Sequence, residues 1–119
     1  MKLLIENGAD INIKNETGKT PLHSSIVRNR IGSVQVLIEK GADLEARDMD
    51  ENTPINIAVI LGRVDIMRLL IQNGADIETK GVGRITPLKS AALSDRFDIM
   101  KLLIKNGADM NDIRFEIVV

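Results

Sequence analysis

The feature that most constrains this chain is an internal repeat of 33 residues. The tripeptide Gly-Ala-Asp recurs with that spacing, beginning at Gly8, Gly41, Gly74 and Gly107. The dipeptide Thr-Pro keeps the same period, with its threonines at Thr20, Thr53 and Thr86. Two independent markers with one period and no insertion predict a tandem array of structural units that stack on their neighbours.

Each unit carries the signals of two short helices. Thr before Pro is typical of a helix start, because the hydroxyl caps a free backbone N–H and proline suits the first helical position. In the central unit apolar residues at helical spacing follow Pro54 until Gly62, and Asn29 and Asp95 occupy the same stop position in the flanking units. A second helix is expected from about Val64 to Asn73. Helices this short need stacking to be stable.

The period also predicts the core. Equivalent buried positions are expected at Leu22, Ile55 and Leu88 in the first helices and at Leu37, Leu70 and Leu103 in the second helices. With only two aromatic residues in the chain, the core must consist of aliphatic side chains and methionine.

Composition narrows the class of function. The formal net charge is −1 and there is no Trp or Tyr, which argues against a nucleic-acid binder because such proteins carry a basic excess or aromatic platforms. The absence of cysteine removes disulfides and thiolate metal sites and fits a cytoplasmic location. No apolar run approaches the roughly 18 residues that a membrane span needs. We expect a soluble protein with no membrane, nucleic-acid or cofactor partner.

The residues around each Thr-Pro resemble the ankyrin repeat. They read Thr20-Pro21-Leu22-His23, Thr53-Pro54-Ile55-Asn56 and Thr86-Pro87-Leu88-Lys89, each followed by a leucine-rich helix and Gly-Ala-Asp. The resemblance extends from Met1 to about Ile113. It implies an all-α ankyrin-repeat solenoid of stacked antiparallel helix pairs with projecting turns. It also implies a non-catalytic module that binds another protein, as a scaffold, adaptor or inhibitor.

The repeat divides the chain into a truncated repeat at 1–14, three full repeats at 15–47, 48–80 and 81–113, and a tail at 114–119. Met1–Ile5 aligns with Met67–Ile71, so the chain begins inside a second helix. We expect either a longer array or an end covered by another chain, including self-association. The apolar tail has three possible interpretations: a docking segment, a cap on the last helix pair, or the point where a longer chain was cut.

The third loop, residues 80–85, departs most from the family pattern. The tip glycine, Gly18 in the first loop, becomes Glu51 and then Arg84, and the entry residue at Asp48 becomes Gly81. The pattern therefore predicts the helices of this unit but not the geometry of its turn.

Polar residues that recur once per unit are expected to be structural. Asp10, Asp43, Asp76 and Asp109 are interpreted as turn residues, because carboxylates one repeat apart are too far from each other to share a small ion. The resemblance implies that His23, the only histidine, bonds a neighbouring turn. The column Arg30, Arg63 and Arg96 is interpreted as a solvated face, with an acidic or phosphorylated partner as the alternative. No catalytic, cofactor or metal site is expected.

The resemblance implies that partners meet the loop tips and the exposed side of each first helix. On the helices these positions are Val27, Ile60 and Leu93, followed by Arg28, Leu61 and Ser94. At the loop tips they are Lys19, Met49, Asp50, Asn52, Val82 and Ile85. The alternative for the apolar column is packing between repeats. For the whole chain the alternatives are a structural spacer, a fragment of a longer array, or an effector delivered into a host cell.

Overall fold

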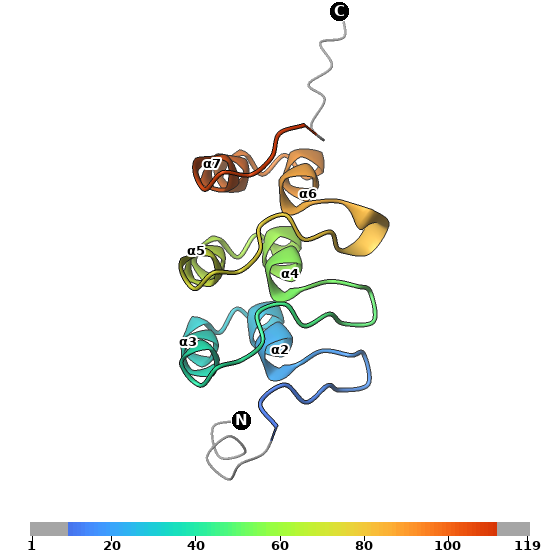
Figure 1. The fold of residues 1–119 in the computed structure, drawn as a ribbon, viewed down its shortest axis with the longest axis vertical. Coiled ribbons are helices and arrows are strands. Elements are labelled where there is room, and N and C mark those ends of the chain that lie inside the picture. Colours follow the sequence, from blue (N-terminus) through green and yellow to red (C-terminus); the bar gives the residue numbers. More distant parts are fainter. Residues whose placement is uncertain (1–9, 112–119) are drawn as a thin grey trace, which may run out of the picture.

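The computed structural model describes residues 10–111, in which six α-helices form three pairs (Figure 1). The first helices are α2 (Pro21–Val27), α4 (Pro54–Leu61) and α6 (Pro87–Leu93). The second helices are α3 (Ile31–Glu39), α5 (Val64–Gln72) and α7 (Phe97–Lys105). A short 3-10 turn, η1 (Val82–Arg84), lies in the third loop, and residues 10–111 contain no strand. The all-helical fold expected from the repeat is confirmed.

The helix pairs stack in two parallel rows. In one row α2 packs against α4 and α4 against α6, and in the other row α3 packs against α5. The loops that precede the first helices project away from the second helices (Figure 1). One flank of the stack therefore consists of first helices and projecting loops, which we call the inner face.

The helices begin and end where the sequence predicts. The side chains of Thr20, Thr53 and Thr86 each accept a hydrogen bond from the backbone N–H three residues later, and a proline follows each threonine. The predicted stop positions are all left-handed, with φ of 54° at Asn29, 71° at Gly62 and 55° at Asp95. Asparagine and aspartate tolerate this conformation better than most side chains, which explains why they replace glycine there.

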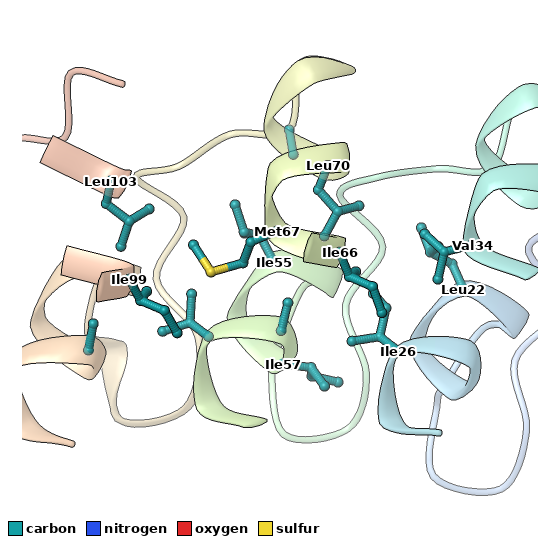
Figure 2. Packing of buried hydrophobic residues seen from close by; sticks show 14 of the residues in the cluster. Leu22, Ile26, Val34, Ile55, Ile57, Ile66, Met67, Leu70, Ile99 and Leu103 are labelled. Carbon is teal, nitrogen blue, oxygen red and sulfur yellow. The ribbon is translucent and has the colours of Figure 1, made fainter. Parts of the chain in front are cut away.

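The core runs through the stack as one aliphatic cluster (Figure 2). The six predicted core positions, Leu22, Ile55, Leu88, Leu37, Leu70 and Leu103, are each at most 1% exposed. Helices of seven to nine residues are too short to be stable alone, so burial between neighbouring pairs must stabilise them.

Some expectations fall on residues outside the described part. The helix expected around Met1–Ile5 and the tail at 114–119 lie there, and the boundaries of the repeats stay predictions. In residues 10–111, no helix has the length and apolar character that crossing a bilayer requires.

Candidate functional site

The apolar column Val27, Ile60 and Leu93 lies on the last turn of the three first helices, on the inner face. Val27 and Ile60 are each 39% exposed and Leu93 is 69% exposed. Arg28, Leu61 and Ser94, at the next position of each repeat, are also exposed. The column is therefore partly packed against its surroundings, but it reaches the surface in every repeat.

The loop-tip candidates differ in accessibility. Met49, Asp50 and Val82 are exposed, with Met49 at 72%. Ile85 is half-buried. Lys19 is also half-buried, and its ammonium forms an ion pair of 3.2 Å with the buried carboxylate of Asp48. Lys19 therefore serves the contact between two loops.

The expectation that Asn52 belongs to an exposed loop tip is wrong. Asn52 is only 7% exposed. Its backbone N–H donates to the Asp48 carboxylate at 3.0 Å, and its Oδ1 accepts the N–H of Val82 at 2.9 Å. Position 52 lies behind the tip in the direction of the next repeat, so its side chain joins two loops instead of facing a partner.

The three projecting loops share one hydrogen-bonding scheme despite their different sequences. In each, the N–H of the entry residue donates to the carbonyl four residues on, and its own carbonyl accepts the N–H three residues on. The tip residues are left-handed in all three loops, with φ of 76° at Gly18, 67° at Glu51 and 59° at Arg84. The irregular third sequence thus forms the same turn, with η1 at its centre.

His23 is fully buried and connects α2 to the second loop, as expected. The N–H of Thr20 donates to Nδ1 at 3.1 Å, and Nε2 lies 2.9 Å from the carbonyl oxygen of Asn52. Because a carbonyl oxygen only accepts, Nε2 must carry a proton. Nδ1 accepts the N–H of Thr20 and so carries none, which makes the ring neutral. Burial lowers the pKa of His23, and the bond to Asn52 and the nearby Asp48 oppose that shift without cancelling it.

The interpretation of the arginine column as a solvated face is wrong for Arg63 and Arg96. Arg63 donates to the carbonyl oxygens of Ile26 at 3.2 Å and Val27 at 2.8 Å. Arg96 donates to the carbonyl oxygen of Ile60 at 3.2 Å. Each guanidinium therefore caps the last carbonyls of the first helix in the preceding repeat, where a cation is favoured. Arg30 is exposed.

The recurring aspartates have the structural role that was expected. Each accepts the backbone N–H two residues later at 2.8 or 2.9 Å, in the same way at Asp10, Asp43, Asp76 and Asp109. A second ladder crosses between repeats: Asn12 accepts the N–H of Asp43, and Glu45 accepts the N–H of Asp76. Burial raises the pKa of Glu45. Within residues 10–111 no three acidic or histidine side chains converge as a metal site requires.

Sequence reasoning missed Arg47. Its guanidinium donates to the carbonyl oxygens of Glu51 at 2.7 Å and Lys80 at 2.6 Å, and to the hydroxyl of Thr79 at 3.0 Å. One repeat earlier, Lys14 donates to the carbonyl oxygen of Arg47 at 2.8 Å. The signal was available in the sequence, because positions 14, 47 and 80 are all basic. These side chains tie each loop to the next.

Two hollows lie beside the third loop. An open cleft of about 610 Å³ separates the second and third loop tips and is bordered by Arg47, Met49, Lys80, Val82 and Arg84, among others. A smaller hollow of about 50 Å³, which we call the slot, lies between α4, α6 and the third loop. Gly81 and Val82 border both hollows. The slot opens beside Ile60, so the apolar column and the loop tips meet there.

Comparison with known families agrees with this geometry. A family model described as ankyrin repeats matches the chain over residues 1–81 and 47–114, with three copies of the repeat. No curated protein matches the chain.

Proposed function

Because this chain belongs to the ankyrin-repeat family, whose members are generally protein–protein interaction modules, we propose that it binds a partner protein through its inner face. The observation that carries this proposal is the apolar column Val27, Ile60 and Leu93, which is exposed in every repeat. Contiguous apolar residues on a soluble surface are typical of interaction sites. In this proposal the chain is a non-catalytic scaffold, adaptor or inhibitor, and its cytoplasmic location stays a prediction.

The distribution of exposed apolar side chains favours a binding module over a structural spacer. On the inner face they are Val27, Met49, Ile60, Leu61, Val82 and Leu93. Elsewhere in the described part they are Ile13, Ile31, Phe97, Ile104 and Met110. Within the inner-face set, Val27, Ile60 and Leu93 occupy one equivalent position in all three full repeats, and Met49 and Val82 share another, whereas Leu61 has Arg28 and Ser94 as its equivalents. An apolar residue exposed at the same helix position of every full repeat is not something that a spacer requires.

The proposal is tested by capture with matched variants. Tagged protein and its Ile60→Asp and Ile104→Asp variants are used to capture proteins from the native cell, with quantification by mass spectrometry. Ile104 is 38% exposed, close to the 39% of Ile60, but lies on α7 in the other row. We expect Ile60→Asp to lose a partner that Ile104→Asp retains, because an unpaired carboxylate is costly in an apolar interface.

Circular dichroism and thermal melting of all three proteins show whether each one is folded. A partner retained equally by both variants would reject the inner face as the binding site.

A further inference from the structure

The contact between the first two full repeats is filled by large side chains on the inner face. Lys19 and Asp48 form their ion pair there, and His23 is fully buried. Ile57 of α4 is 5% exposed and lies between α4 and α2 (Figure 2).

The next contact, between the second and third full repeats, has a smaller residue at each of these four positions. One period later, Asn52 replaces Lys19 and Asn56 replaces His23. In the same way, Gly81 replaces Asp48 and Ser90 replaces Ile57. All four smaller residues line the slot of about 50 Å³. The slot thus follows from lost side-chain volume, and it occurs where the inner-face pattern changes.

Part of that lost volume is recovered by the backbone. Gly81 approaches so closely that an added Cβ would meet Oδ1 of Asn52 and would lie 2.7 Å from Oδ1 of Asn56. The side of the slot nearer solvent stays open, next to Ile60, Val82 and Ile85. One water needs about 10–15 Å³, so a slot of about 50 Å³ has room for a small branched aliphatic group.

The surroundings of the slot carry a one-sided charge. Residues 79–94, which form the third loop and α6, include Lys80, Arg84 and Lys89 and no Asp or Glu. Within residues 10–111, none of these three cations forms an ion pair. Lys80 and Arg84 border the cleft that adjoins the slot, whose lining also includes Arg47, Asp50 and Glu51 from the second loop, so the cations outnumber the carboxylates by three to two. This flank therefore attracts a carboxylate placed next to an apolar group.

Resting on the proposed function, we infer that the slot and the adjoining cleft form the anchor site for the partner. The occupant is a segment of the partner protein with one branched aliphatic side chain in the slot. A carboxylate close to that side chain lies over Lys80 and Arg84 in the cleft. Between the first two full repeats the equivalent positions hold the larger residues Lys19, His23 and Ile57, so the partner is held in one register along the stack.

The chain itself supplies the variant that tests the slot. The residue equivalent to Ser90 in the preceding repeat is Ile57. Ser90→Ile therefore fills the slot with a side chain that the fold already accommodates at the equivalent position. Ser24→Ile is the matched control, because it makes the same change at the equivalent position of the first full repeat, away from the slot. Ser90→Val serves the same purpose if isoleucine prevents folding.

The two probes are 4-methylpentan-1-ol and 4-methylpentanoate, which have the same carbon skeleton and differ in charge, and their binding to the full chain is measured by methyl NMR. We expect shifts of the Ile60, Val82 and Ile85 methyl groups in the wild type and in Ser24→Ile, and none in Ser90→Ile. The anionic probe should bind more tightly than the alcohol, up to about fivefold, and Arg84→Ala should reduce that difference, because only Lys80 then remains of the two cations. If the methyl shifts in Ser90→Ile equal those in the wild type, or if the shifts occur elsewhere on the protein, the slot is not the site that binds the probes. Equal affinities of the two probes would overturn the carboxylate preference.

A partner identified by capture distinguishes this inference from the proposed function. Ser90→Ile should weaken binding of that partner by about tenfold or more, since the loss of a methylene-sized apolar contact in a pocket changes affinity by roughly 10- to 200-fold. If Ile60→Asp abolishes binding and Ser90→Ile leaves it unchanged, the inner face is the binding site but the slot is not its anchor. If neither substitution has an effect, both ideas fail.

Discussion

Nε2 of His23 lies 2.9 Å from the carbonyl oxygen of Asn52, a residue 29 positions later in the next repeat. The same Asn52 accepts the N–H of Val82 in the third loop through its side chain. Two residues thus connect three consecutive repeats. Because the repeats contact only their neighbours, such links make the stack unfold cooperatively.

His23 should make the protein less stable at mildly acidic pH. Its folded pKa is lowered, so the unfolded chain binds the proton more readily, and the free energy of unfolding falls as the pH drops below the ordinary value of 6.5. The melting temperature should therefore decrease as the pH is lowered from 7.5 to 5. His23→Asn, which copies Asn56 of the next repeat, should flatten this dependence. An unchanged pH profile in that variant would mean that another group titrates.

Asp48 should extend the acid sensitivity to lower pH. Burial alone would raise its pKa, but the N–H of Asn52 and the ammonium of Lys19 outweigh burial and lower it. The stabilisation is present above the ordinary carboxyl range and is lost as pH falls through the lowered value. Lys19→Met should reduce the fall in melting temperature that accompanies protonation of Asp48 below pH 4. A steeper loss in Lys19→Met would contradict the ion pair.

Arg63 should contribute more to stability than an arginine in a surface ion pair. Arg63→Ala removes donors to the carbonyls of Ile26 and Val27 and leaves the end of α2 without its cap, at a cost of about 1–3 kcal/mol. Arg68 is the control, since its pair with Asp65 is solvent-exposed and such pairs contribute about 0–1 kcal/mol. Urea unfolding measures both. Equal effects would show that the capping bonds add nothing.

Two glycine substitutions should act in opposite directions. Gly81→Ala places a Cβ against Asn52 and Asn56 although its φ of −102° suits any residue, so we expect a loss of roughly 1–3 kcal/mol from steric overlap. Gly32→Ala, inside α3 with no atom within 4 Å, should stabilise by about 0.5–1 kcal/mol. Thermal melts of the two variants decide. A tolerated Gly81→Ala would show that the third loop can move aside.

Two isoleucines on α4 separate core from surface. Ile57 is 5% exposed, so Ile57→Ser should cost about 2–4 kcal/mol through lost burial and an unfilled cavity. Ile60 is 39% exposed, and Ile60→Ser should cost less than about 1 kcal/mol. The two variants are compared by their denaturant midpoints, and the slope of the unfolding free energy against denaturant concentration should be the same in both. A large loss at Ile60 would identify the apolar column as core and remove it as a binding surface.

Much of the fold was readable from the sequence because its signals are local. Thr53-Pro54 starts a helix and Gly62 ends it through interactions within a few residues, and the 33-residue period then identifies Leu22, Ile55 and Leu88 as one layer of core. The exposed positions Val27, Ile60 and Leu93 were expected from the resemblance to the ankyrin repeat, with packing between repeats as the alternative. The irregular third turn was not predicted, because its hydrogen bonds depend on Arg84 adopting a conformation that glycine usually supplies.

The sequence by itself determined the repeating unit. Helix capping and helix termination depend only on residues close by in the chain, and burial of the aliphatic residues at fixed spacing needs only an equivalent unit beside each unit. The tertiary structure decided which polar side chains face solvent and which join the repeats. Asn52 is buried, and Arg63 and Arg96 cap the helices of the repeat before them, through contacts between residues about 30 or more positions apart. The slot beside Ile60 arises in the same way, because its volume depends on how four small residues from two repeats pack together.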